Sequence, residues 1–279
     1  MYIDLEMAPL TEISECIYER LRLAACSEQR RALILSLNEG EKSLSDLRDE
    51  MQLDSATIIH ALRALERDNF VREDANRYYF LTVIGKTAAR KVIDFYETTG
   101  TLLKYETFWL EHDLSGIPDY LFDRIGALRD STLVVDTELD PFKAYHSFVV
   151  YLEKSSTLEL IASVSAPDPL SLFGEFVVGH KHIELVATEP VLDYAIEELG
   201  QARVKEALRA GHKLYALRHD PKLVFAVADD VIVLILFRLD GRFDYSAALT
   251  SESPEAIAWG HEMFRHYVEL SESVTLLHA

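Results

Sequence analysis

The order of elements in residues 27–82 restricts the fold of this chain more than any other feature. Apolar side chains recur at helical spacing in residues 27–37, in residues 44–51 and in the segment after Ser55, and short polar turns separate the three segments. Residues 69–71 then start a strand, residues 74–76 form a turn, and residues 77–81 form the return strand. The pattern predicts a three-helix unit that ends in a β-hairpin.

Polar side chains mark where the second and third helices begin. Ser43 can accept a backbone N–H bond at the start of the second helix, and Asp46 lies favourably in its first turn. Asp54 or Ser55 is a suitable N-cap for the third helix. The third helix then buries one stripe of side chains, which are Ile58, Leu62 and Leu65.

The other face of the third helix carries small and polar side chains, namely Ser55, Thr57, His60, Ala61, Arg63, Ala64 and Arg67. Small residues let a helix approach a DNA groove closely, and threonine, histidine and arginine offer donors to base edges and phosphates. The hairpin would contact the DNA backbone or the minor groove. We therefore predict these DNA-binding residues: Ser55, Thr57, His60, Arg63, Arg67, Arg72, Asn76 and Arg77.

The complete order of these elements resembles archaeal and bacterial winged helix-turn-helix regulators. Leu62-x-x-Leu65-Glu66 leads into Phe70-Val71, and Leu81-Thr82-x-x-Gly85 follows the hairpin. The resemblance implies that double-stranded DNA is the partner. The alternative is a protein–protein module, because three-helix units with a hairpin also serve that purpose. Arg63 and Arg67 would then be ordinary solvated charges.

The formal net charge of −19 does not exclude DNA binding, because the excess acid lies elsewhere. Residues 27–91 contain 11 Lys and Arg and 11 Asp and Glu, so this segment is neutral. Salt screens exposed charges beyond about 8–10 Å, which allows a locally positive surface on an acidic protein. We expect weak nonspecific DNA binding, since few phosphates would be neutralised.

Apolar helical stripes flank the three-helix unit on both sides. One lies on residues 10–25, a second lies on the helix that runs from the hairpin towards Gly100, and residues 101–112 form a further segment. The stripes either pack on the three-helix unit or form a dimer interface. We predict a homodimer, because two-fold symmetry matches a palindromic operator. The second stripe consists of Ile84, Ala88, Val92 and Phe95.

After Pro118 the pattern changes to alternating helices and strands. Helices are predicted over residues 119–128, 141–152, 168–178, 190–210 with a break at Gly200, and 254–270. Strands are predicted over residues 132–135, 157–164, 182–187, 212–217, 223–228, 231–237 and 243–249, with a hairpin at Asp229-Asp230. The predicted fold class is α/β overall, with a winged helix-turn-helix (α+β) followed by an α/β domain with a mixed sheet.

Two stretches of the chain resemble the archaeal methanogenesis-regulator family. They are Phe108-Trp109-x-x-His112-x-Leu114-x-x-Ile117-Pro118 and Gly241-x-Phe243-Asp244…Leu249-x-Ser251…Ala256-Ile257-x-Trp259-Gly260-x-x-x-Phe264. The resemblance implies a transcription regulator whose winged helix is joined to an effector-sensing domain. That domain also resembles the phospholipase-D-type fold with which archaeal sugar-responsive repressors sense ligands.

The predicted organisation has four segments. Residues 1–26 form an N-terminal helix for dimerisation, and residues 27–82 form the DNA-binding winged helix-turn-helix. Residues 83–117 form linker helices for dimerisation, and residues 118–279 form the α/β effector-sensing domain.

The second domain lacks the residue patterns of an enzyme. Phospholipase-D-type enzymes carry His-x-Lys-x4-Asp, and neither His180-Lys181-His182 nor His212-Lys213 places a lysine two residues after a histidine. His180 and His182 could share a metal, yet a third ligand at a recognisable spacing is missing. Asp229-Asp230 fits a solvated turn. We predict no catalytic residue, no metal site and no cofactor.

Side chains at strand ends are the candidates for effector binding, because ligands of α/β sheets bind outside the carboxyl ends of the strands. The candidates are Asp136, Ser163, Ser165, Thr188 and Arg218. The alternative is that all five are ordinary loop residues, since a domain that only mediates assembly needs no pocket.

Several features predict a cytoplasmic protein with no membrane partner. No apolar run reaches the roughly 18–20 residues that cross a bilayer. Residues 1–4 lack the features of a signal peptide. Only Cys16 and Cys26 are present, which argues against a secreted disulfide scaffold and fits structural or incidental thiols.

The sequence therefore predicts a dimeric transcription regulator that binds a pseudo-palindromic operator and responds to a small molecule or a protein effector. An alternative is a protein-interaction module of the transcription machinery without specific DNA binding, which the acidity favours. A third interpretation is a degenerate phospholipase-like hydrolase, whose activity would depend on His180 or His212.

Overall fold

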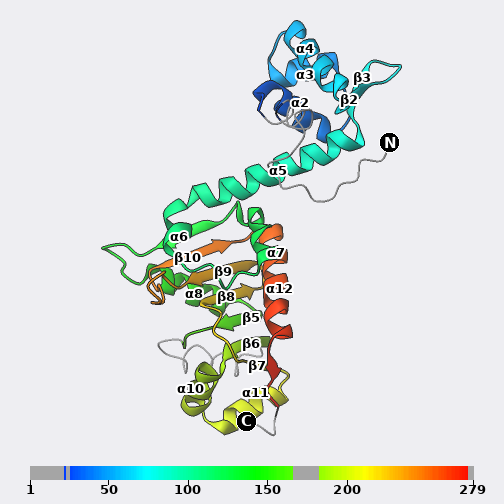
Figure 1. Cartoon of the computed structure of the whole chain (residues 1–279). Helices are drawn as coiled ribbons and strands as arrows, with labels where there is room; N and C mark the ends of the chain where they lie inside the picture. The colour runs from blue at the N-terminus through cyan, green and yellow to red at the C-terminus, as the bar shows by residue number, and fades with distance from the viewer. Residues whose placement is uncertain (1–21, 23–25, 166–181, 276–279) are drawn as a thin grey trace, which may run out of the picture. The chain divides into compact units, whose positions relative to one another are not determined.

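The computed structural model describes residue 22, residues 26–165 and residues 182–275 (Figure 1). It divides into two compact units, Met1–Tyr96 and Glu97–Ala279. The predicted helix over residues 168–178, the predicted helix over residues 10–25 apart from residue 22, and also Cys16, His180 and Lys181 lie outside the described residues. The dimerisation roles of residues 1–26 and 83–117 stay predictions.

The first unit contains the predicted three helices and hairpin. They are α2 (Glu28–Asn38), α3 (Leu44–Met51), α4 (Ser55–Arg67), β2 (Val71–Glu73) and β3 (Tyr78–Leu81), and α5 (Val83–Lys104) follows. A short strand that the sequence did not reveal, β1 (Lys42–Ser43), pairs with β3 to complete a three-stranded sheet in the order β1-β3-β2. Leu33, Leu47, Ile58, Leu62 and Leu65 are fully buried together. The winged helix-turn-helix fold is therefore confirmed.

Two alanines of α4 do not lie where the sequence placed them. Ala61 and Ala64 were expected on the face opposite the core, but they are only 4% and 7% exposed. Ala61 lies three residues after the buried Ile58, and Ala64 lies three residues after Ala61, so the apolar side of α4 is wider than a stripe of Ile58, Leu62 and Leu65. Small size here serves close packing inside the unit.

The helix after the hairpin is longer than the sequence indicated. It was expected to run towards Gly100 and to be followed by a second segment, yet α5 continues through Gly100 to Lys104. A glycine costs a helix about 1 kcal/mol relative to alanine, and the flanking turns of a 22-residue helix outweigh that cost. The remaining helix of that segment, α6, is Glu106–Glu111.

The second unit is built on an eight-stranded mixed sheet in the order β11-β7-β6-β5-β8-β9-β10-β4. β5, β6 and β7 are parallel, and the remaining pairings are antiparallel. The α/β prediction is confirmed. The strands are β4 (Thr132–Val135), β5 (Thr157–Ala162), β6 (His182–Thr188), β7 (Lys213–Leu217), β8 (Leu223–Ala228), β9 (Val231–Leu236), β10 (Ala247–Ser251) and β11 (Glu272–Ser273).

Helices cover both faces of this sheet, and each face has its own core. The helices are α7 (Asp119–Phe122), the 3-10 helix η2 (Ile125–Leu128), α8 (Lys143–Lys154), α10 (Glu189–Leu199), α11 (Gln201–Arg209) and α12 (Pro254–Glu269). Side chains of α6, α7, η2 and α12 pack on one face around Trp259. Side chains of α8 and α10 pack on the other face. This is why β8 and β9 are buried along their whole length.

Several local predictions for this unit are confirmed and three are corrected. Gly200 separates α10 from α11 with φ 81, and the β8–β9 hairpin turns at Asp229 with φ 47. The helix predicted over residues 119–128 is divided into α7 and η2. β10 begins at residue 247 and not at residue 243, because the preceding segment turns at Asp244, whose carboxylate accepts a bond from Ser246 N at 3.0 Å. The short edge strand β11 was missed.

Candidate functional site

Side-chain caps fix the start of both helices of the helix-turn-helix. Ser43 Oγ accepts a hydrogen bond from Asp46 N at 3.3 Å, and Asp46 Oδ2 accepts one from Ser43 N at 2.9 Å. Asp54 Oδ1 accepts from Thr57 N at 2.9 Å at the start of α4. Hydrogen bonds from Thr57 hold the pKa of Asp54 below its usual value, so this carboxylate stays ionised and favourable at the helix N-terminus. The caps set the direction in which α4 leaves the turn.

The exposed face of α4 differs in part from the prediction. His60, Arg63 and Arg67 are exposed, as expected. Ser55 and Thr57 are only half-exposed, and Thr57 donates its hydroxyl to Asp54 Oδ2 at 2.6 Å. Sequence reasoning missed Ile59, an apolar side chain that is 38% exposed beside His60. Ile59 does not share the helical spacing of the buried Ile58, Leu62 and Leu65, which predicts that its side chain is exposed. An apolar side chain at this position can contact a thymine methyl group.

Arg63 already has partners within the unit. Its Nη1 lies 2.7 Å from Glu66 Oε2, and its Nη2 lies 3.6 Å from Glu73 Oε2 at the end of β2. The hydrogen bond with Glu66 raises the pKa of the guanidinium above its usual value. Arg63 therefore links α4 to the hairpin, and a DNA contact would require it to exchange carboxylates for phosphate or base.

The hairpin presents the remaining predicted residues at its tip and outer face. Asp74 Oδ1 accepts hydrogen bonds from Asn76 N at 2.9 Å and from Tyr78 N at 2.7 Å, which closes the turn. Arg77 occupies the turn with φ 68, and Arg72 pairs with Phe80 across the ladder. Arg72, Asn76 and Arg77 are all exposed. The hairpin thus presents two exposed cations, Arg72 on β2 and Arg77 in the turn.

Three of the predicted arginines have no ion-pair partner in the described part of the chain. Arg67, Arg72 and Arg77 form no ion pair with any residue that the structure describes. They lie at the end of α4, on β2 and in the hairpin turn respectively. A polyanion could therefore be bound by these side chains without first breaking an internal salt bridge.

The five predicted effector residues lie along one edge of the large sheet. β5, β6 and β7 are parallel, and four successive antiparallel pairings give β4 the same direction as β5. Asp136, Ser163, Thr188 and Arg218 therefore all follow or end strands at the same edge, and Ser165 follows Ser163.

Most of these five side chains have structural partners. Asp136 Oδ1 accepts from Ala144 N at 2.9 Å and caps α8, and Ser163 Oγ accepts from Leu223 N at 3.2 Å. Thr188 is buried at the start of α10, and Arg218 pairs with Glu272. Ser165 alone of the five lines an apolar pocket. The structure therefore brings the five to one edge but not to one site.

Other polar side chains that the sequence analysis considered as functional candidates form hydrogen bonds within the fold. The carboxylate of Asp229 accepts bonds from Ser156 N and Thr157 N at 2.7 Å each, so it anchors the start of β5. His212 Nδ1 lies 3.1 Å from Ile183 N, and burial lowers the pKa of this histidine. Within the described ranges no group of three His, Cys, Asp or Glu side chains could hold a metal ion. Nor is any described helix long and apolar enough to cross a membrane.

The two stretches that carry the family resemblance meet in space. His112 Nε2 lies 3.0 Å from Asp244 Oδ2, and His112 Nδ1 lies 2.6 Å from Phe108 O, with both side chains at most 5% exposed. Burial favours the neutral form of Asp244, but hydrogen bonds from Ser246 and His112 and the nearby Arg238 outweigh it and lower the pKa of Asp244. The carboxylate therefore remains charged in the interior.

The Trp-Gly motif has a comparable packing role. Trp259 is fully buried, and its Nε1 donates to Leu121 O at 2.9 Å. A Cβ at position 260 would lie 2.9 Å from methyl groups of Ile232 and Val227, so only glycine lets α12 approach the sheet this closely. Both motifs thus have packing roles in the fold of the domain.

Comparison with known proteins shows the family to which this chain belongs. The chain combines a winged helix-turn-helix with a separate α/β domain. Residues 18–98 match the N-terminal domain of "Methanogenesis regulatory protein FilR1", and residues 141–270 match the middle domain of the same protein. The chain belongs to this archaeal methanogenesis-regulator family, as its sequence motifs predicted.

A curated relative has the same name and comes from Methanothrix harundinacea (strain 6Ac). It is 25% identical over 260 residues, which cover 92% of this chain and 58% of the relative. The chain thus spans somewhat more than half the length of the relative.

Solved structures show only distant similarity. TrmBL2, described as an archaeal chromatin protein with a novel mode of DNA binding, is 15% identical with a TM-score of 0.41, over 92% of this chain and 99% of that one. HmgR from Pseudomonas aeruginosa is 13% identical with a TM-score of 0.25, over 85% and 93% of the two chains. These scores are too low to support a functional comparison. The likeness of the second domain to the phospholipase-D-type fold stays a prediction.

Proposed function

We propose that the chain is a DNA-binding transcription regulator of the cytoplasm, not an enzyme, which binds a pseudo-palindromic operator as a homodimer. The observation that carries the proposal is a set of three arginines with no ion-pair partner among the described residues, namely Arg67, Arg72 and Arg77, which extend from α4 to the hairpin tip within the neutral segment 27–91. α4 would enter the major groove, and the hairpin would contact the backbone beside it. The name of the related family supports the same assignment.

The dimer part of the proposal is supported by exposed apolar side chains on α5. Ile84 is 52% exposed and Phe95 is 64% exposed, although both lie on the stripe that the sequence suggested for dimerisation. Exposed side chains of this size favour burial against a second copy. Phe95→Glu should shift the sedimentation coefficient from dimer to monomer, whereas Arg90→Glu, an exposed position on the opposite face of the same helix, should leave it unchanged. A wild-type monomer at micromolar concentration would contradict the dimer.

The DNA part is tested by selecting fragments of the source genome with purified protein at physiological salt. Enrichment of an inverted repeat with half-sites about one helical turn apart is expected. Arg77→Ala and Arg72→Ala should each weaken binding and reduce the slope of log affinity against log salt by about 1. Arg209→Ala, on α11 of the other unit, is the matched control. If the salt slope is unchanged in both hairpin variants, Arg72 and Arg77 do not contact DNA phosphates.

The second candidate function is a protein-interaction module of the transcription machinery. The net charge of −19, which lies outside the winged-helix segment, favours a basic partner for the second domain. This alternative predicts no enrichment of any DNA fragment, with or without a small-molecule extract of the cells. The same arginine variants would then alter only the capture of a protein partner.

A further inference from the structure

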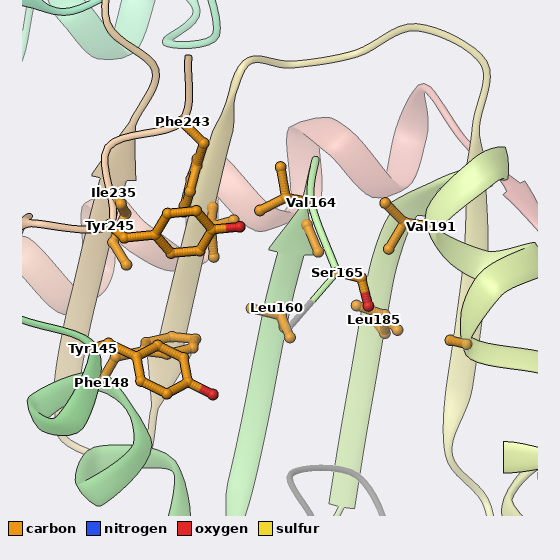
Figure 2. Close-up of a pocket in the computed structure, with 13 residues that line it drawn as sticks. Tyr145, Phe148, Leu160, Val164, Ser165, Leu185, Val191, Ile235, Phe243 and Tyr245 are labelled. Atoms are coloured by element: carbon orange, nitrogen blue, oxygen red, sulfur yellow. The ribbon is translucent and has the colours of Figure 1, made fainter. Parts of the chain in front are cut away.

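An apolar pocket opens on the face of the large sheet that α8 and α10 cover (Figure 2). Four neighbouring strands supply its floor through Leu160, Leu185, Val224 and Ile235, which are 3–6% exposed. Because β5, β6, β8 and β9 hold these side chains in register, the floor is rigid. It is an extension of the core of this face and opens to solvent on one side.

Aromatic side chains from two separate segments form one wall of the pocket. Phe148 and Tyr145 come from α8, and Phe243 and Tyr245 come from the segment before β10; Figure 2 shows the two pairs one above the other beside the floor. Phe243 and Tyr245 pack edge to face with their centroids 4.6 Å apart. Phe148 is 6% exposed while Tyr245 is 46% exposed, so the wall runs from the core to the surface. Such a wall suits a flat ring.

The described residues that line the pocket carry no charged side chain. Of the described residues that form the pocket, none is Lys, Arg, Asp, Glu or His, and the polar atoms are the hydroxyls of Tyr145, Ser165 and Tyr245. A charged ligand would lose its hydration here without gaining an ion pair, which is costly. An apolar pocket with a few polar groups is the usual form of a small-molecule site.

We propose that this pocket binds a small uncharged molecule with an aromatic or alicyclic body. We also assign it as the effector site, an assignment that rests on the proposed regulatory function. The pocket lies between α8, α10 and the segment before β10, so a bound molecule would contact all three. Sugars, nucleotides and carboxylic acids do not fit this lining, because each brings many polar groups or a charge.

The test uses the full chain and a pair of matched probes, 1-naphthol and 1-naphthoate, which share a bicyclic ring but differ in charge at neutral pH. Calorimetric titration should show 1-naphthol binding at least about tenfold more tightly, because burying an unpaired carboxylate is unfavourable. Val191→Trp, which fills the pocket from α10, and Tyr245→Ala, which removes one ring of the wall, should each weaken 1-naphthol binding at least about tenfold. Tyr120→Ala is the control, since Tyr120 is 47% exposed on α7 outside the pocket.

Circular dichroism establishes whether each variant is folded. If Val191→Trp does not fold, Tyr245→Ala alone tests the pocket. Equal or tighter binding of 1-naphthoate would overturn the proposal. Unchanged 1-naphthol affinity in the folded pocket variants would also overturn it.

Repeating the DNA selection with 1-naphthol present separates the two proposals. Pocket binding that leaves DNA retention unchanged overturns the effector assignment alone. Pocket binding in a protein that selects no DNA supports the ligand site and counts against the regulator.

Discussion

The polar contacts of the two units differ in how far apart in the sequence the contacting residues lie. In the winged-helix unit three contacts that shape the candidate interface join residues three apart, as in Ser43 with Asp46, Asp54 with Thr57 and Arg63 with Glu66, and they are exposed. In the α/β unit the comparable contacts are buried and span 132 to 151 residues.

This difference predicts which substitutions should destabilise each unit most. Exposed short-range contacts contribute about 1 kcal/mol or less each, because water replaces them readily. Buried long-range contacts leave an unsatisfied group in the interior when one partner is removed. The following substitutions test this contrast, beginning with the largest expected loss.

Trp259→Ala should destabilise the α/β unit by about 4 kcal/mol, since it removes a fully buried ring and leaves a cavity. Chemical denaturation followed by circular dichroism measures the loss. The same variant should leave the thermal transition of the winged-helix unit in place. A loss below about 1 kcal/mol would mean that the domain closes around the missing ring.

Asp244→Ala should cost about 3 kcal/mol, because His112 and the bonded N–H of Ser246 would lose a buried charged acceptor. Denaturation at neutral pH gives the value. Asp240→Ala is the control, since its ion pair with Arg242 is at the surface. Equal losses in both variants would break the contrast between buried and exposed contacts.

Tyr267→Phe should cost about 1–1.5 kcal/mol at neutral pH, because the Tyr267 hydroxyl donates to Gly116 O at 2.6 Å in the interior. Burial raises the pKa of Tyr267 to about 12. A raised pKa stabilises the folded state fully below the unfolded value near 10 and loses that contribution as the pH rises from about 10 to about 12. The difference in stability between wild type and variant should therefore shrink over this pH range, as measured by denaturation at a series of pH values.

Asp54→Ala should have the smallest effect, about 1 kcal/mol, since it removes only an exposed helix cap. The pKa of Asp54 is lowered, so the cap contributes above the unfolded value near 4 and its contribution is lost as the pH falls through the folded value. Asp49→Ala on α3 is the control, because Asp49 caps no helix. Thermal melting of the winged-helix unit at pH 7 and at pH 3 should show the difference between the two variants shrinking in acid.

The same contrast explains how much the sequence could predict. Ser43, Asp54 and the stripe of Ile58, Leu62 and Leu65 act within a few residues, so their patterns specify the helix-turn-helix directly. Gly200 and Asp229 likewise mark a helix break and a hairpin by local backbone geometry. These features depend on neighbours that are adjacent in the printed sequence.

The features that were not predicted depend on contacts between residues that lie far apart in the sequence. The contact between His112 and Asp244, the pairing of β1 with β3 and the late start of β10 are all set by segments far along the chain. Among the candidate site residues, the exposure of Ile59 follows from helical spacing and could have been found. The ion pair of Arg63 with Glu73 could not, since it requires the hairpin to fold back on α4.

The position of β4 at the far edge of the sheet has a consequence for the order in which the protein is made. Among the described strands of its sheet, β4 is the first to be synthesised, yet it pairs only with β10, whose Thr250 lies opposite Thr132. A ribosome would therefore release the whole winged-helix unit, free to fold, well before β4 has a neighbour. During that interval the newborn α/β segment exposes unpaired strand edges, so synthesis, more than the finished molecule, is the stage at which this chain would need a chaperone.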